Sequence, residues 1–354
     1  MAHAALQEAM KDRALIEDDL RQFSTMWQQQ YAAGPVDMIA AYCSILLRGG
    51  KRLRGILALQ SYYAHGGSDQ TVALGAARVL ELLHAYLLVI DDVADNSHIR
   101  RGGPSAHHLI EAEMKDTHLH VDAKHYAELQ AINAALAAQH VANLELMKLP
   151  IQRDALVRAL MSLHTTINQT CMGQIEDMYN ETTNVVFNED GIESTLTKKT
   201  AHYTVLGPLE LGACLAGASL CEPLKQYSLA LGCAFQIFDD IISTFDDEQE
   251  SGKDKNDDIR EGKMTLLRYY AEAHADKQDQ EILRAAFGNH EADDEICDQV
   301  REIMRSTGTR TRAEERAMQY ISSASYALNR VDYLPETFMS FLRELSDYVA
   351  KRKA

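Results

Sequence analysis

Apolar residues along most of the chain recur at intervals of three and four, and runs that alternate apolar and polar residues are few. This spacing is typical of helices that bury one face against a common core. The chain has only six prolines and 19 glycines, and no stretch has the composition of a linker between domains. The pattern therefore predicts an all-α protein that forms a single domain over residues 1–354.

The predicted helices follow one another with short breaks. The first covers residues 4–31 and ends near Gly34-Pro35, and a second runs from there to about Leu47. The later predicted helices cover 71–95, 120–149, 153–180, 192–218, 280–287, 291–306, 312–329 and 336–353.

Charge and composition restrict the kind of partner. The formal net charge of −17 disfavours nonspecific binding of nucleic acid or of an anionic membrane surface, so an anionic substrate needs a local basic cluster. The six cysteines include no CxxC pair and suit reduced core thiols. The charged N-terminus does not read as a signal peptide, and no uninterrupted apolar run of 18 residues occurs, so we expect a cytoplasmic protein without a membrane segment.

An apolar helix that carries His84 leads into three acids, Asp91, Asp92 and Asp95. Because a helix turns by roughly 100° per residue, Asp91 and Asp95 share a face, with His84 two turns before them. Two carboxylates so placed suit a magnesium ion that keeps positions open for phosphate oxygens. A solvated acidic helix end is the alternative; the apolar run before the acids and the arginine pair at residues 100–101 weigh against it.

A second acidic pair, Asp239 and Asp240, also follows an apolar run, and a polar loop then brings Lys253, Asp258 and Lys263. We expect the helices of the two acidic pairs to face each other across a cavity.

Other polar groups interrupt apolar segments. The stretch 48–55 reads RGGKRLRG and places Lys51, Arg52 and Arg54 at a helix start, where an anion is favoured, although such loops are often only solvated. The segment GQIED, residues 173–177, suits either a cavity wall or an exposed stripe. Lys199, Thr200 and Tyr203 together suit an anionic ligand or an ordinary helix surface.

In combination these features resemble the trans-isoprenyl diphosphate synthases, the polyprenyl synthase family. The motifs of that family occur in the family's order over residues 49–265. They are GGKRLR, DDVAD followed by RRGGPSAH, GQIED, KT with a tyrosine beyond it, FQIFDD, and GK with DIREGK. The resemblance implies a helical bundle around a deep central cavity, usually a homodimer. It also implies a magnesium-dependent condensation of isopentenyl diphosphate with an allylic diphosphate, with three ions per active site.

The resemblance also implies roles for individual residues. The expected metal ligands are Asp91, Asp95 and Asp239, with the adjacent acids Asp92 and Asp240. The expected residues for the allylic diphosphate are Arg100, Lys199, Lys253 and Lys263, with Thr200 and Gln236 near the reacting carbon and Tyr203 beyond them. The expected residues for isopentenyl diphosphate are Lys51, Arg54, His84 and Arg101.

The chain departs from the family pattern at three places. Ser243 stands where many members have the last aspartate of the second motif, and Gly55 stands where proline is frequent. Ala135 and Leu136 stand where the family often has Gly-Asp, which bears on helix packing near the cavity or the dimer surface.

Product length depends in this family on bulky residues shortly before the first acidic motif. Here Tyr86 and Leu87 occupy those positions, and a single aromatic residue there resembles geranylgeranyl diphosphate synthases. Tyr86 lies about 140° from Asp91 on the helical wheel, so it also suits ordinary core packing. Farnesyl diphosphate synthase is the first alternative. A class I terpene cyclase and a noncatalytic subunit of a partner synthase are the others.

Overall fold

The computed structural model describes residues 4–31, 38–115, 122–183, 188–245 and 255–351. Its contacts divide the chain into two compact units. The N-terminal unit comprises Gln7–Leu160 and Glu210–Ser219, and the C-terminal unit comprises Met1–Leu6, Met161–Leu209 and Leu220–Ala354. The helices that continue from one unit into the other are α1 (Ala4–Met10), α8 (Arg153–Thr183) and α10 (Gly207–Leu215).

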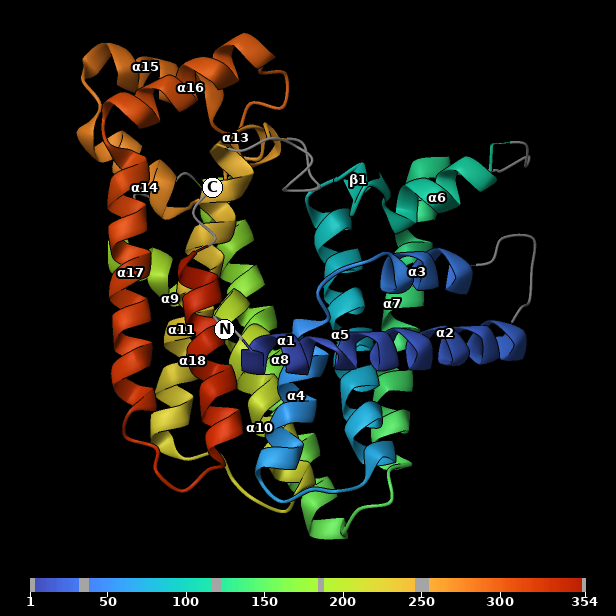
Figure 1. The fold of residues 1–354 in the computed structure, drawn as a ribbon. Helices are drawn as coiled ribbons and strands as arrows, with labels where there is room; N and C mark the ends of the chain where they lie inside the picture. The colour runs from blue at the N-terminus through green and yellow to red at the C-terminus, as the bar shows by residue number, and fades with distance from the viewer. Residues whose placement is uncertain (1–3, 32–37, 116–121, 184–187, 246–254, 352–354) are drawn as a thin grey trace. The chain divides into compact units, whose positions relative to one another are not determined.

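The N-terminal unit is built around two long helices (Figure 1). α5 (Gln70–Ala94) lies along α7 (Ala123–Met147), and α4 (Leu53–Ala64) packs against α5. α2 (Asp12–Tyr31) crosses both α4 and α5. The remaining elements are α3 (Met38–Leu47), an antiparallel hairpin of β1 (Ile99–Arg100) and β2 (Gly103–Pro104), and α6 (Ala106–Glu113).

The buried face of α7 consists almost entirely of alanines. Apart from the adjacent Ala134 and Ala135, they recur at intervals of three and four and so line one face: Ala127, Ala131, Ala134, Ala135, Ala138 and Ala142. Small side chains let helix axes approach closely, and α5 is the helix that α7 contacts most extensively. Ala135 is a fully buried member of this face.

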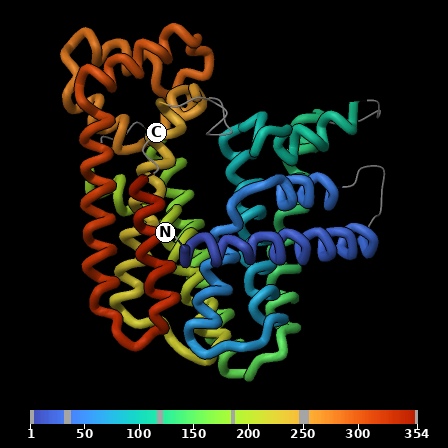
Figure 2. Tube along the Cα trace, viewed as in Figure 1, coloured from blue at the N-terminus to red at the C-terminus, as the bar shows by residue number. Residues whose placement is uncertain are grey.

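The C-terminal unit is centred on α11 (Glu222–Phe245), which can be followed in yellow in Figure 2. α11 packs along η1 (Thr197–Leu206), α17 (Thr309–Leu328) and α18 (Glu336–Ala350). The buried Tyr227 hydroxyl donates to the Leu342 carbonyl oxygen at 2.8 Å, which joins α11 to α18. The remaining helices are α9 (Glu189–Leu196), α13 (Asp257–Arg260), α14 (Leu266–His274), α15 (Lys277–Ala286) and α16 (Asp294–Ser306).

The prediction of an all-α fold is confirmed, and the single domain and its deep central cavity stay predictions. Several predicted helix limits were wrong. The helix expected over 4–31 is interrupted at Lys11, whose N–H bonds three residues back to Glu8. The helix expected over 192–218 is α9, η1 and α10, and η1 is a π-helix that no residue preference signals. α14 was missed, although Thr265 caps it through the Arg268 N–H.

α5 and α11 are long and apolar enough to span a membrane by length and composition alone. Most of the apolar stretch of each is buried inside the structure, however. Their hydrophobicity is thus accounted for by packing against other helices, as in the core of a globular protein.

Candidate active site

The first acidic motif lies at the C-terminal end of α5. Asp91 and Asp92 occupy the last helical turn, and Asp95 is the C-cap residue, whose N–H donates to the Asp91 carbonyl oxygen. Asn96 then adopts a positive φ of 50°, which ends the helix. The Asp92 side chain is only 1% exposed, whereas that of Asp91 is 21% exposed. Asp91 is therefore the more accessible of the adjacent acids.

Arg100 on β1 binds this motif directly. Its Nε donates to Asp92 Oδ1 at 2.6 Å, and its Nη2 lies 3.2 Å from Asp91 Oδ2. Burial by itself would lower the pKa of Arg100, but Asp92 and Asp91 raise it above its ordinary value. The hairpin thus places a permanent cation beside the carboxylates.

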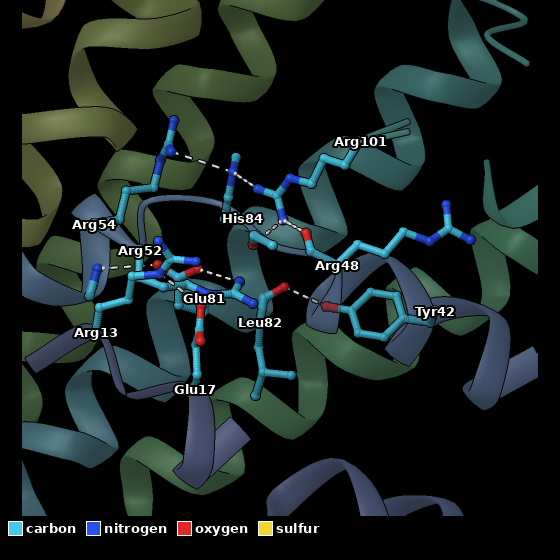
Figure 3. A network of polar contacts seen from close by, with 12 residues as sticks. Arg13, Glu17, Tyr42, Arg48, Arg52, Arg54, Glu81, Leu82, His84 and Arg101 are labelled. Atoms are coloured by element: carbon cyan, nitrogen blue, oxygen red, sulfur yellow. Dashed lines mark hydrogen bonds and ion pairs between the residues drawn. The ribbon is translucent and has the colours of Figure 1, made fainter. Parts of the chain in front are cut away.

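Basic side chains gather around His84 of the same helix, and this cluster is called the basic pocket below (Figure 3). His84 Nε2 lies 3.0 Å from Arg101 Nη2 and 3.4 Å from Arg54 Nη1. Because guanidinium groups only donate, Nε2 accepts and the imidazole is neutral. Burial and the nearby arginines lower the pKa of His84 well below its usual value. Burial likewise lowers the pKa of Arg101 to about 10. Such crowding of cations suits a bound anion.

Two loop segments, one at Arg48 and one at Arg101, are hydrogen-bonded to each other beside these basic side chains. Arg48, just before the two glycines, donates from Nη1 to the carbonyl oxygens of Pro104 and Arg100. Arg101 in turn donates to the Arg48 carbonyl oxygen at 3.2 Å. Sequence reasoning assigned Arg48 no role, and its position beside GGKRLR was the only signal. Lys51 is exposed at the edge of the same loop.

Arg52 does not belong to this basic pocket. Its side chain is buried and ion-paired with Glu81, so the expectation that it joins Lys51 and Arg54 as an anion-binding group is wrong.

The second acidic motif lies near the C-terminal end of α11. Thr200 Oγ1 donates to Gln236 Oε1 at 3.2 Å, and Gln236 Nε2 donates to Asp240 Oδ1 at 2.7 Å. Burial, together with the charges of Asp258 and Asp239, raises the pKa of Asp240 to about 8. The structure thus brings Thr200, Gln236 and the acidic pair together, as expected.

Ser243, the departure from the family pattern in the second motif, is hydrogen-bonded to the carboxylate of Asp258. Its hydroxyl donates to Asp258 Oδ2 at 2.6 Å. Lys263 Nζ lies 3.4 Å from Asp258 Oδ1 and 2.9 Å from Glu261. The sequence placed Asp258 and Lys263 in one polar loop, but it did not show that Ser243 joins Asp258 to the motif.

Lys199 and GQIED meet between η1 and α8. Lys199 Nζ donates to Asp177 Oδ2 at 2.5 Å. A Cβ atom at Gly173 would lie 2.3 Å from the Lys199 backbone nitrogen, so only glycine permits this approach. Tyr203 is half-buried in η1, and Lys253 lies outside the described residues.

The aspartates of the two acidic motifs could supply some of the ligands of a magnesium ion, but not all of them. Among residues that the structure describes, no three acidic, histidine or cysteine side chains converge as a complete metal site. Carboxylate oxygens are the hard donors that magnesium prefers, and one or two of them usually suffice when substrate phosphates and water complete the shell. Asp91 with Asp95, and Asp239, match that requirement.

Comparison with known proteins agrees with this chemistry. A family model described as polyprenyl synthetase matches residues 36–304. The geranylgeranyl diphosphate synthase of Saccharolobus solfataricus is 30% identical over 305 residues, covering 86% of this chain and 87% of its own. The geranylfarnesyl diphosphate synthase of Aeropyrum pernix is 27% identical over 319 residues, covering 90% and 95%.

A solved structure is also similar over nearly the whole chain. It is geranylgeranyl pyrophosphate synthase from Corynebacterium glutamicum, complexed with isoprenyl diphosphate and magnesium. The two chains share 32% identity with a TM-score of 0.90, covering 98% of this chain and 99% of the other. This chain therefore belongs to the polyprenyl synthetase family, and it is a trans-prenyltransferase.

Proposed function

We propose that this protein is a magnesium-dependent geranylgeranyl diphosphate synthase that adds isopentenyl diphosphate to an allylic diphosphate. The observation that carries the proposal is the arrangement at the end of α5, where carboxylates with metal-ligand spacing stand close to a basic pocket. A diphosphate headgroup needs both kinds of group.

The two acidic motifs have the same role in this proposal. Asp91, Asp95 and Asp239 would hold magnesium, which supplies charge neutralisation for the departing diphosphate. Asp92 is buried against Arg100, and Asp240 accepts from Gln236, so both orient neighbouring groups. Three ions per active site are part of the proposal.

The basic residues divide between the two substrates. Lys51, Arg54, His84 and Arg101 hold the diphosphate of isopentenyl diphosphate, and Arg100, Lys199, Lys253 and Lys263 hold that of the allylic substrate. The allylic C–O bond breaks, the isopentenyl double bond attacks the cation, and the proton lost goes to the released diphosphate. The Thr200 hydroxyl and Gln236 lie near the reacting carbon, and their mutual hydrogen bond fixes their orientation.

Product length is the finer part of the proposal. Tyr86 and Leu87 are half-buried on α5, one turn before Asp91. A large aromatic side chain there would close the channel for the growing tail, and we assign a twenty-carbon main product. The Saccharolobus and Corynebacterium proteins are named for that product, whereas the Aeropyrum protein is named for a longer one.

Incubation of the purified protein with magnesium, isopentenyl diphosphate and each of the five-, ten- and fifteen-carbon allylic diphosphates tests the proposal. We expect geranylgeranyl diphosphate as the main product. Tyr86→Ala should shift products to longer chains, because truncation opens space below the tail. Leu88→Ala, a nearby truncation on α5, is the control. An unchanged distribution in an active Tyr86→Ala enzyme would show that another residue closes the channel.

The alternatives predict different products. A farnesyl diphosphate synthase would stop at fifteen carbons. A terpene cyclase would release hydrocarbon and would leave the His84 pocket without use, and a noncatalytic subunit would give no product alone. The presence of the basic pocket and of both acidic pairs favours a prenyl diphosphate synthase over the cyclase and the noncatalytic subunit.

We further propose a cytoplasmic homodimer. α7 exposes Leu129, Leu136 and Met147 along one face, and α8 exposes Met161, Met172, Ile175 and Tyr179. Exposed apolar stripes of this kind support an interface between subunits. Leu136, a departure from the family pattern, is 46% exposed and belongs to this stripe. The mass in solution, measured by light scattering, tests the dimer.

A further inference from the structure

Arg52 differs from the exposed Lys51 of the 48–55 loop because it is buried, and its contacts can be followed in Figure 3. Its Nη1 donates to Glu81 Oε2 at 3.0 Å, and both side chains are 2% exposed. Its Nε lies 3.9 Å from Glu17 Oε1, the same oxygen that accepts from Arg13 Nε at 2.9 Å. A buried guanidinium between two carboxylates is neutralised by them, so its role lies in holding structure.

The second oxygen of Glu81 bonds the start of α4. Glu81 Oε1 accepts from the Gly55 backbone N–H at 3.3 Å. Arg52 is the N-cap residue of α4, with a left-handed φ of 52°, and its side chain makes no capping bond. A carboxylate from α5 therefore accepts a hydrogen bond from an N–H that has no partner within the first turn of α4. Its negative charge also interacts favourably with the positive N-terminal end of the helix dipole.

Glu81 thereby connects the start of α4, which carries Arg54, to α5, which carries His84. It precedes His84 by three residues on α5, so the two share a face. Arg54 follows Arg52 by two residues and approaches His84 Nε2 at 3.4 Å. The carboxylate of Glu81 thus fixes where α4 begins relative to the imidazole.

Gly55 makes part of this connection possible. Proline, frequent in the family at this position, has no N–H and could not donate to Glu81. A Cβ atom at residue 55 would lie 3.1 Å from the Ala77 Cβ and 3.2 Å from the Ile16 Cδ1. Alanine and proline would both add that Cβ, but only proline removes the donor. Proline also restricts the backbone of the preceding Arg54, so Gly55→Ala controls for the added Cβ alone.

We propose that Glu81 is a positioning residue of the isopentenyl diphosphate site. Through the Arg52 side chain and the Gly55 N–H, it holds Lys51 and Arg54 where they bind the diphosphate of that substrate. The identity of the ligand rests on the proposed function, whereas the connection itself rests on the contacts above.

Glu81→Gln keeps the shape of the side chain and removes its charge. We expect KM and the calorimetric Kd for isopentenyl diphosphate to rise about tenfold, and KM for the allylic substrate to stay within about twofold. Gly55→Pro should weaken isopentenyl diphosphate binding more than Gly55→Ala does. Asp18→Asn, on an exposed position of α2, is the control for a lost charge.

The double variant Arg52→Met with Glu81→Leu separates positioning from stability. It removes both buried charges, so the thermal midpoint should recover relative to Glu81→Gln. Isopentenyl diphosphate binding should stay weak, because the loop is no longer tied to α5. Recovery of both properties in the double variant would overturn the proposal.

Binding and turnover together distinguish the two proposals. If Glu81→Gln and the double variant bind isopentenyl diphosphate within twofold of the unmodified protein, or if both substrates lose affinity equally, the positioning role is wrong. If the unmodified protein forms no prenyl product but the difference in Kd persists, the positioning role stands and the proposed function is wrong.

Discussion

The ends of α5 and α11 have the same sequence pattern, an apolar run followed by paired aspartates, but different electrostatic surroundings. At the end of α5, Arg100 contacts both acids of the pair. At the end of α11, Gln236 donates a neutral hydrogen bond to Asp240, while Asp258 adds a third negative charge nearby. The first pair is bonded to a guanidinium, whereas the raised pKa of Asp240 indicates that the carboxylates of the second motif crowd one another, although Lys263 lies beside Asp258.

This difference indicates different dependence on a bound cation. A carboxylate bonded to arginine keeps its orientation without metal, whereas crowded carboxylates repel each other until a cation binds. The motif at α11 should therefore change more on metal binding than the motif at α5, although both supply ligands in the proposed mechanism.

The largest expected effect comes from removing a metal ligand. Asp91→Ala, Asp95→Ala and Asp239→Ala should each reduce kcat by about a hundredfold or more, about 2.7 kcal/mol in the barrier. Steady-state kinetics at saturating magnesium measure this loss, with Asp18→Ala as the surface control. Near-normal turnover in all three variants would refute the metal assignment at both helix ends.

Next in size is the division of the cations between substrates. Lys51→Ala and His84→Ala should raise KM for isopentenyl diphosphate by roughly ten- to hundredfold, since a charge-assisted phosphate contact contributes about 1.5–3 kcal/mol. Arg100→Ala should act mainly on the allylic substrate and should also lower the thermal midpoint, because Asp92 stays buried without its partner. Equal effects of all three variants on both substrates would contradict the division.

A smaller effect should distinguish the second motif. Ser243→Ala removes the hydrogen bond to Asp258 and should cost about 1 kcal/mol of unfolding free energy. Ser243→Asp adds a carboxylate to the crowded cluster, so its thermal midpoint in the presence of a chelator should be lower than that of the unmodified protein. Added magnesium should raise the thermal midpoint of Ser243→Asp by more than it raises that of the unmodified protein. A midpoint of Ser243→Asp that does not respond to magnesium would argue against cation binding at α11.

The sequence predicted much of this arrangement because the relevant spacing is local. Asp91 and His84 share one helix, so the period of that helix placed them on one face. The sequence places Arg100 a few residues after the acids, and its role toward the allylic diphosphate, which the family resemblance implies, stays a prediction. Its direct contact with Asp92 depends on the hairpin that follows α5.

Long-range contacts were not accessible in the same way. Arg52 reads like any basic loop residue, and only the fold shows that Glu81, 29 residues later, neutralises it. In the sequence, Ser243 indicates only that the second motif lacks its last acid, but in the fold it is hydrogen-bonded to the carboxylate of Asp258. Side chains that pair across a fold carry no periodic signal, so sequence alone assigned both residues incompletely.

The π-helical stretch η1 changes the number of residues per helical turn along the chain. Each of its hydrogen bonds spans five residues instead of four, so each turn of η1 contains more residues than a turn of α9 before it or of α10 after it. Within η1, Lys199 bonds Asp177 on α8 and the next residue, Thr200, bonds Gln236 on α11. One segment thus supplies two neighbouring helices from consecutive positions. These contacts depend on the wide backbone turns of η1, so removing one of its residues would change which neighbouring helix each of these side chains faces.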